Sequence, residues 1–173
     1  MFTLPMESVA GHCVEATWNK ALNLQQEAED WYNKKALLFN QFLIAYQNQP
    51  LLHKTFDQDD MRSLIRSNSK IHQKKLDQQF EALTLTVAQI NNEVSRVREQ
   101  SDIVKLAYAN WASIYDHCNQ AGLAINSASS QRYMQINQNI LQDTKTLLNK
   151  YKFLLDVYEK EVKVLESGSQ QRN

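Results

Sequence analysis

The stretch Leu76–Cys118, LDQQFEALTLTVAQINNEVSRVREQSDIVKLAYANWASIYDHC, decides the fold, because apolar residues recur in it at alternating steps of four and three. The recurring positions are Leu76, Phe80, Leu83, Val87, Ile90, Val94, Val97, Ser101, Val104, Tyr108, Trp111, Tyr115 and Cys118. Only Ser101 is polar. A four-three repeat of this length winds an apolar seam along a helix and is typical of coiled coils and helical bundles. The stretch therefore predicts a long helix packed against others.

The helix breakers divide the rest of the chain. Proline lacks the amide donor and glycine costs about 1 kcal/mol inside a helix, so long helices exclude both. They occur only at Pro5, Gly11, Pro50, Gly122 and Gly168. We therefore expect helices over 13–48, 57–119 and 127–166, an irregular arm over 1–12, a turn over 49–56 and a flexible tail over 167–173. Ser67-Asn68-Ser69 is poor helix material, which predicts a kink near 67–69.

The connections predict the topology. They are short, and short connections favour antiparallel neighbours, so the fold class is all-α: an elongated antiparallel three-helix bundle with coiled-coil packing, a single domain over 13–166. This register places Trp18 and Tyr133 near Trp111. It also places Tyr46 near Leu85, and Leu154 near Ile90. Gln25 and Lys35 interrupt the apolar stripe of the first helix, and each is expected to find a polar partner or to reach water.

Charge and apolar content limit the classes of protein to consider. The 173 residues carry 19 basic and 19 acidic side chains, so no global field favours nucleic acid or an anionic membrane. No stretch approaches the roughly 20 apolar residues of a membrane span, and the first thirteen residues lack the basic start of a secretory signal. We expect a cytoplasmic protein, with non-classical export to a host or the extracellular space left open. Abundant Asn and Gln are typical of AT-rich bacterial genomes.

The two cysteines, Cys13 and Cys118, are too few for a disulfide framework and are interpreted as reduced thiols, with Cys118 a small apolar seam residue. Two alternatives stay open. A Cys13–Cys118 disulfide would require an oxidising compartment. A zinc site of His12, Cys13, His117 and Cys118 would fit no known finger or ribbon spacing, and adjacent helical residues point about 100° apart.

An external partner is predicted where the apolar stripe of the second predicted helix is narrow. Polar residues flank its seam from Leu76 to Ser101, yet the facing segments, Phe39–Tyr46 and Leu147–Leu165, are strongly apolar. An uncovered apolar patch usually marks an interface, so a protein partner or self-association is expected there. The alternative is that the first and third helices cover each other. The candidate residues are Phe39, Phe42, Tyr46 and Leu155.

A basic row gives a second candidate surface. Arg62, Arg66, Lys70 and Lys74 repeat every four residues, so on a continuous helix they would stack along one face. Such a face could bind an acidic protein, nucleic acid or lipid headgroups. No aromatic residue is interleaved for base stacking, and Asp57, Asp59 and Asp60 dilute the charge. The alternative is a solvated helix face.

Catalytic signatures are missing from the sequence. It contains no His-Glu-x-x-His, no Glu-x-x-His pair, no glycine-rich phosphate loop and no serine elbow. We therefore expect no enzyme, no cofactor and no resident metal. The sequence favours a non-enzymatic protein–protein interaction module of the adaptor, chaperone, secretion-machine or bacterial effector type. The alternatives are a self-assembling structural coiled coil, and a binder of nucleic acid or anionic membrane through the 62–75 row.

Overall fold

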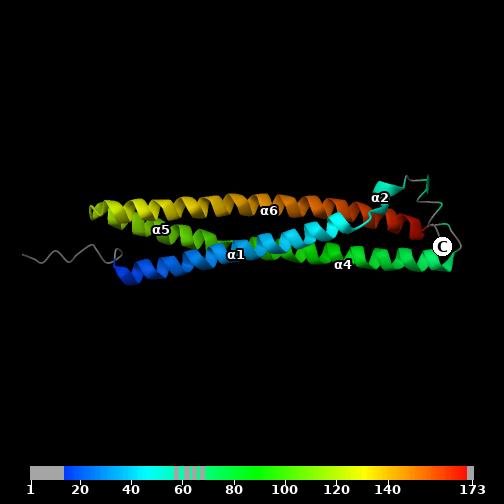
Figure 1. Cartoon of the computed structure of the whole chain (residues 1–173), viewed down its shortest axis with the longest axis horizontal. Coiled ribbons are helices and arrows are strands. Elements are labelled where there is room, and N and C mark those ends of the chain that lie inside the picture. Colours follow the sequence, from blue (N-terminus) through cyan, green and yellow to red (C-terminus); the bar gives the residue numbers. More distant parts are fainter. Residues whose placement is uncertain (1–13, 57–58, 61–62, 64–65, 67–68, 171–173) are drawn as a thin grey trace, which may run out of the picture. The chain divides into compact units, whose positions relative to one another are not determined.

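The computed structural model describes residues 14–56, 59–60, 63, 66 and 69–170. Its bounded helices are α1 (Glu15–Asn48), α2 (Leu52–Thr55), α4 (Lys70–Gln100), α5 (Asp102–Gln120) and α6 (Ala124–Gln170), and the described residues include no strand (Figure 1). The predicted all-α class is confirmed. The arm predicted over 1–12 and the end of the predicted tail, 171–173, lie outside the described residues. None of the described helices is long and apolar enough to cross a membrane.

The helix predicted over 57–119 is interrupted twice. One break lies where the sequence predicts it, since α4 begins at Lys70 after the non-helical Ser69. The other was not predicted: α4 ends at Gln100 and α5 begins at Asp102. The hydroxyl of Ser101 donates to the carbonyl of Arg98 over 2.9 Å. A serine that bonds to nearby backbone competes with regular helix, which gives a local cause for the break.

Gly122 makes the turn between α5 and α6, as expected of a helix cap. Its φ of 73° lies in the left-handed region that favours glycine. The amide of Gly122 donates to the carbonyl of Asn119, and the amide of Leu123 donates to that of Cys118, which is the Schellman pattern. α6 then begins at Ala124, earlier than the predicted start at 127. The small-residue stretch that was expected to connect the helices is itself helical. Ser130 is buried there, and its hydroxyl donates to the carbonyl of Asn126.

The described residues divide into two compact units. Unit 1 contains α1 up to Ala36 together with Arg98–Thr146, and unit 2 contains Leu37–Val97 together with α6 from Leu147 onward. The single bundle expected over 13–166 stays a prediction. Each unit takes segments of α1 and α6, and adds either α5 or α4 as its third main helix.

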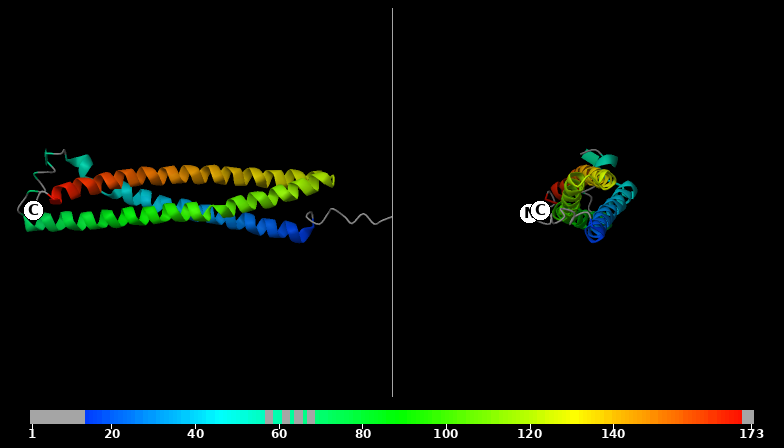
Figure 2. Two further views of the ribbon diagram at one scale, coloured as in Figure 1. Left: turned by 180° about the vertical axis from the view of Figure 1, so that it is seen from behind. Right: turned by 90° about the vertical axis from the view of Figure 1, so that its left-hand side faces the viewer.

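Aromatic packing fixes the register of unit 1. The rings of Trp18 and Trp111 meet edge to face at 5.2 Å, and Trp111 stacks on Tyr133 at 4.2 Å. These contacts confirm the predicted neighbours. Farther along, Trp31 Nε1 donates to Gln100 Oε1 over 3.4 Å, so α1 runs antiparallel to the 98–120 segment. Figures 1 and 2 show α5 alongside α6 beyond the Gly122 turn.

A polar cluster lies inside the core of unit 1. Gln25 is 3 % exposed and Asn137 is fully buried. Gln25 Oε1 accepts hydrogen bonds from Trp111 Nε1 and from Asn137 Nδ2, while Gln25 Nε2 donates to Glu29. This arrangement confirms that Gln25 finds a polar partner. The cluster joins α1, α5 and α6 at one level of the unit.

Unit 2 combines α1, α4 and α6 with the α2 segment. Phe39 and Tyr46 of α1 contact Tyr151 and Tyr158 of α6, so these two helices run parallel. The colours in Figure 1 show that α4 runs opposite to α6. Leu154 and Ile90, predicted neighbours, are both fully buried, whereas Leu85, expected beside Tyr46, is 59 % exposed. The turn over 49–56 contains α2, and the buried carboxylate of Glu161 accepts a hydrogen bond from the Leu52 amide at its start.

Burial along the seam repeats every seven residues. In unit 2 the buried seam residues include Leu76, Leu83, Ile90 and Val97, and in unit 1 they are Val104, Trp111 and Cys118. The alternate seam positions are mostly half-buried. The apolar repeat thus predicts which face of each helix is covered, while coiled-coil packing itself stays a prediction.

Candidate interaction face

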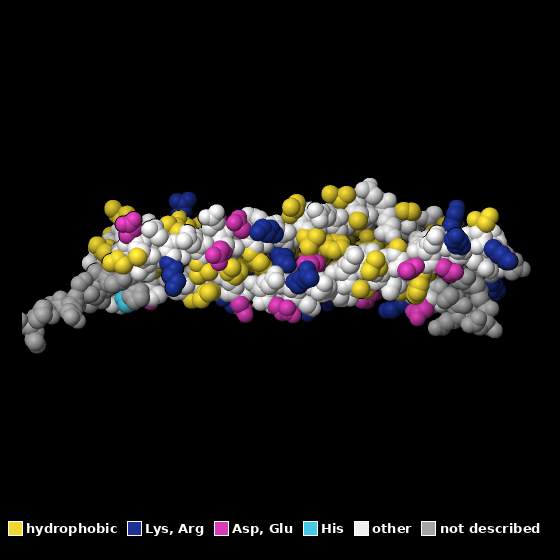
Figure 3. Space-filling model, turned by 90° about the horizontal axis from the view of Figure 1, so that it is seen from below, with side chains coloured by type: hydrophobic (Ala, Val, Ile, Leu, Met, Phe, Trp, Pro, Cys, Tyr) yellow, Lys and Arg dark blue, Asp and Glu magenta, His cyan; other side chains and the backbone are white. Residues whose placement is uncertain are grey.

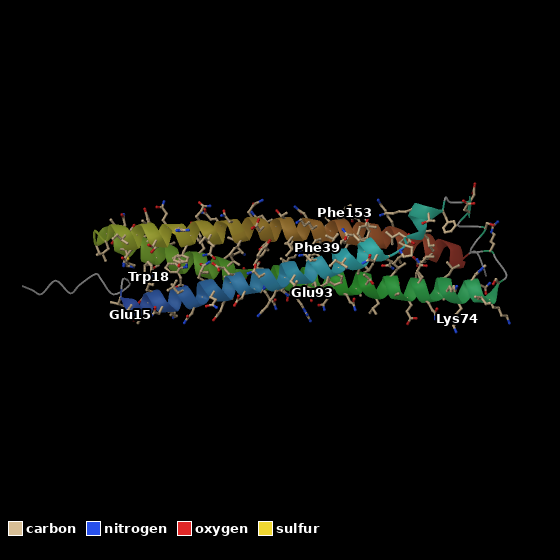
Figure 4. The ribbon with its side chains drawn as sticks, viewed as in Figure 1. Glu15, Trp18, Phe39, Lys74, Glu93 and Phe153 are labelled. Atoms are coloured by element: carbon tan, nitrogen blue, oxygen red, sulfur yellow. The ribbon has the colours of Figure 1, made fainter. Side chains whose placement is uncertain are left out.

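Six aromatic residues form a cluster between α1 and α6 in unit 2. Phe39 and Phe42 meet the ring of Tyr151 edge on, at 5.0 and 6.1 Å. Tyr46 meets Phe153 at 6.4 Å and Tyr158 at 6.2 Å. Tyr151 and Tyr158 are buried, but Phe153 is 57 % exposed. Figure 4 labels Phe39 on α1 and Phe153 on α6. The cluster therefore extends from the core of unit 2 to solvent.

Two lysines border the solvent side of this cluster. Lys54 Nζ lies 4.7 Å from the centroid of the Tyr46 ring and donates to its hydroxyl over 2.6 Å. Lys150 Nζ lies 6.0 Å from the centroid of the Phe39 ring. Both lysines are exposed. An ammonium group over an aromatic face is attracted to it, which holds the charge beside apolar surface. We call Tyr46, Lys54, Lys150 and Phe153 the lysine–aromatic face.

The charge around the lysine–aromatic face is mainly positive. Residues 37–56, which supply its α1 and α2 side, contain Lys54 and no Asp or Glu. On α6, residues 147–160 contain Lys150, Lys152 and Lys160 against Asp156 and Glu159. Such a face suits a partner that combines apolar side chains with carboxylates.

The four predicted interface residues are less exposed than several of their apolar neighbours. Phe39 is buried, and Phe42, Tyr46 and Leu155 are half-buried. The most exposed large apolar residues of this α1–α6 region are others: Leu37 at 60 %, Ile44 at 57 % and Phe153 at 57 %. Sequence reasoning missed these three residues. A usable signal was present, because Phe153 lies off the four-three stripe that contains Tyr151, Leu154 and Tyr158.

The predicted basic row does not lie on one uninterrupted helix. Arg66 is helical, Ser69 is not, and α4 begins at Lys70. Lys70 and Lys74 are exposed and remain one turn apart, and Arg62 lies outside the described residues. On the face drawn in Figure 3, basic and acidic side chains are interspersed rather than gathered. A non-helical residue therefore separates Arg66 from Lys70, and binding through the row stays a prediction.

The tyrosines that line the buried side of the aromatic cluster titrate at unusually high pH. Burial, and secondarily the negative charge of Glu93, raise the pKa of Tyr151 to about 12. Burial, and secondarily Tyr46, raise the pKa of Tyr158. The Tyr151 hydroxyl has no hydrogen-bond partner among the described residues. Both side chains are therefore neutral core residues at physiological pH.

Cys118 differs from the sequence-based interpretation. Cys118 is fully buried, as a seam position predicts, but it is disulfide-bonded rather than a reduced thiol. Cys13 and His12 lie outside the described residues. Among the residues that are described, no group of three or more His, Cys, Asp or Glu side chains could hold a metal ion.

Comparison with protein-family models, with curated proteins and with solved structures finds no match to this chain.

Proposed function

We propose that this chain is a non-enzymatic helical module that binds another protein through the lysine–aromatic face of unit 2. The observation that carries the proposal is Phe153, which is 57 % exposed although it contacts Tyr46 of the aromatic cluster. Exposed aromatic residues supported by a packed base are typical anchors of protein interfaces. Helix formation alone does not require a phenylalanine at position 153.

The chemistry of the face suggests the kind of partner. Lys54 and Lys150 would pair with carboxylates, and Phe153 and Tyr46 would receive an apolar side chain. Because both ammonium groups already lie beside aromatic rings, little side-chain ordering remains to be done on binding. The partner is therefore expected to present an acidic segment with at least one large apolar residue.

The test is affinity purification of the tagged full chain from its native source after nuclease treatment, with Phe153→Glu and Lys54→Glu tested beside the wild type. The matched control is Leu85→Glu, which changes another exposed apolar residue of unit 2, on α4. We expect one stoichiometric protein with the wild type and with the control, and its loss with the two face variants. Equal recovery by all four proteins would refute the lysine–aromatic face as the binding surface.

The solution mass of the chain distinguishes self-assembly, the competing function, from binding to another protein. A protein that acts on a partner keeps a constant solution mass as its own concentration rises, whereas a self-assembling protein grows. Sedimentation of the purified chain over a wide concentration range measures this directly. A mass that increases with concentration and that Phe153→Glu restores to the monomer would replace the partner proposal with self-association at the same face.

A further inference from the structure

The two lysines of the lysine–aromatic face lie beside rings that belong to one helix. Lys150 Nζ lies 6.0 Å from the centroid of the Phe39 ring, and Lys54 Nζ lies 4.7 Å from that of the Tyr46 ring. Phe39 and Tyr46 are separated by two turns of α1, roughly 10 Å along its axis. Both rings face α6, since each contacts a tyrosine of that helix. The face therefore holds two positive charges roughly 10 Å apart.

Apolar surface lies between these two charges. Phe42 is half-buried and lies between Phe39 and Tyr46 on α1. On α6, Phe153 lies about one turn beyond Lys150, and its side chain is 57 % exposed. Along the two helices the face thus presents a positive charge, an apolar surface and a second positive charge.

Both ammonium groups are able to pair with carboxylates of a partner. Among the residues that the structure describes, no Asp or Glu forms an ion pair with Lys54 or Lys150. An ammonium group has three donors, and Lys54 uses one of them on the hydroxyl of Tyr46. Two carboxylates complement the face if their spacing matches that of the two lysines.

This spacing selects the conformation of the partner segment. In a helix, residues i and i+7 share one side about 10.5 Å apart, and residues i+3 and i+4 lie between them on that side. In a strand, side chains of one face are about 6.6 or 13 Å apart, so neither spacing fits. In a polyproline II segment, residues i and i+3 share one side about 9 Å apart, but no side chain lies between them there. Of the three conformations, the helix alone places an apolar side chain between two carboxylates at the required distance.

We propose that the lysine–aromatic face binds an amphipathic helix of another protein, with acidic residues at i and i+7 and a large apolar residue at i+3 or i+4. One carboxylate pairs with Lys54 and the other with Lys150, and the apolar side chain packs against Phe153. The two ion pairs fix the register of the helix, and the apolar contact supplies most of the affinity. The inference rests on the proposed function, because it names the partner of the same face.

Synthetic helical peptides test the spacing. The probe is a fluorescein-labelled, lactam-stapled alanine-based peptide with Glu at i and i+7 and Leu at i+3 and i+4. A matched peptide of the same composition has its second Glu at i+5, which points to another side of the helix. Binding to the full chain is measured by fluorescence anisotropy at low ionic strength. We expect the i+5 peptide to bind about two- to fivefold more weakly, because it loses one ion pair.

Charge exchange assigns each carboxylate to one lysine. We expect Lys54→Glu and Lys150→Glu each to weaken binding of the i, i+7 peptide. Replacing one Glu of the peptide by Lys should restore binding to the first variant, and replacing the other Glu should restore binding to the second. The control is Lys74→Glu, which changes an exposed lysine on α4 and should bind the original peptide like the wild type.

Equal binding of the two spacings, no binding of either peptide, or rescue of both lysine variants by the same exchange would overturn the helical partner. Capture of a protein from the native source decides the proposed function separately. If that capture depends on Phe153 and Lys54 while the peptides show no preference for spacing, the lysine–aromatic face stands and the helical partner is refuted. If neither capture nor peptide binding depends on the face, both proposals fail.

Discussion

The indole Nε1 of Trp111 donates a hydrogen bond to Gln25 Oε1 over 3.0 Å in the interior of unit 1. Because Asn137 Nδ2 donates to the same oxygen, one amide satisfies buried donors from two other helices. Replacing Gln25 by Ala leaves Trp111 Nε1 without its acceptor, whereas Asn137 Nδ2 keeps its hydrogen bond to the carbonyl of Tyr133. An unsatisfied buried polar group costs about 1 to 3 kcal/mol. We expect Gln25→Ala to lower the free energy of unfolding by about 1 to 3 kcal/mol, measured by urea denaturation.

The next residue in the chain supplies the control for this measurement. Gln26 has the same side chain on the same helix but is exposed. Surface substitutions usually change stability by less than about 0.5 kcal/mol, so Gln26→Ala should unfold like the wild type. Equal losses in the two variants would mean that the buried amide contributes nothing beyond helix propensity.

The polar cluster shows how far the sequence predicts the core. The apolar stripe of the first helix predicts that position 25 faces inward, and an inward glutamine requires a partner. The partner could not be named in advance. Trp111 and Asn137 are far away in sequence, and their meeting depends on the rotation of α5 and α6 about their axes. Periodicity alone predicts which face of each helix turns inward. It does not predict the rotation precisely enough to name hydrogen-bond partners.

Tyr151 provides a prediction in alkaline solution. Its pKa is about 12 in the folded chain, above the ordinary value of 10. A raised folded-state pKa means that the folded chain holds the proton where the unfolded chain has lost it. The contribution to stability is therefore complete below pH 10 and is lost as the pH rises from 10 towards 12. We expect Tyr151→Phe to reduce this alkaline decline, measured as urea midpoints between pH 8 and 11.

The same substitution has a second consequence at neutral pH. The Tyr151 hydroxyl is buried without a hydrogen-bond partner among the described residues. Removing it deletes an unsatisfied polar group and keeps the ring that Phe39 and Phe42 contact. Tyr151→Phe should be as stable as the wild type at pH 7, or more stable by up to about 1 kcal/mol. A clear loss of stability would indicate a hydrogen bond that these contacts do not include.

Phe39 and Phe153 should respond oppositely to truncation. Phe39 is 5 % exposed and packs on Tyr151, so Phe39→Ala creates a cavity and should cost about 3 kcal/mol or more. Phe153 is 57 % exposed, and Phe153→Ala should cost about 1 kcal/mol at most, mainly through its contact with Tyr46. Thermal unfolding compares the two variants. A large loss in Phe153→Ala would place this residue in the core and remove it from the lysine–aromatic face.

This contrast also explains why the predicted interface residues were only partly useful. The sequence predicts the apolar segments of α1 and α6. Three residues of the lysine–aromatic face, Tyr46, Lys150 and Phe153, lie on these two helices, and Lys54 lies on α2. Phe39, a predicted contact residue, is buried, and this burial has a physical reason. The strongest apolar stripe is the part that a bundle covers first, so stripe residues are core residues. An interface is better sought among large apolar residues beside the stripe, as Phe153 is.

Glu161 supports the segment that carries Lys54. Its carboxylate is fully buried and accepts a hydrogen bond from the amide of Leu52, the first residue of α2. Charge-assisted bonds to a helix start satisfy an amide that has no partner within the helix. Glu161→Ala should therefore loosen α2 and speed hydrogen exchange at the Leu52 amide by a factor of ten or more, corresponding to roughly 1.5 kcal/mol.

Glu161→Gln keeps an acceptor oxygen and should show a smaller increase in the exchange rate. Glu159→Ala changes an exposed neighbour and should leave the exchange rate unchanged. If Leu52 exchanged at the wild-type rate in Glu161→Ala, the position of Lys54 over Tyr46 would have to depend on contacts other than this hydrogen bond.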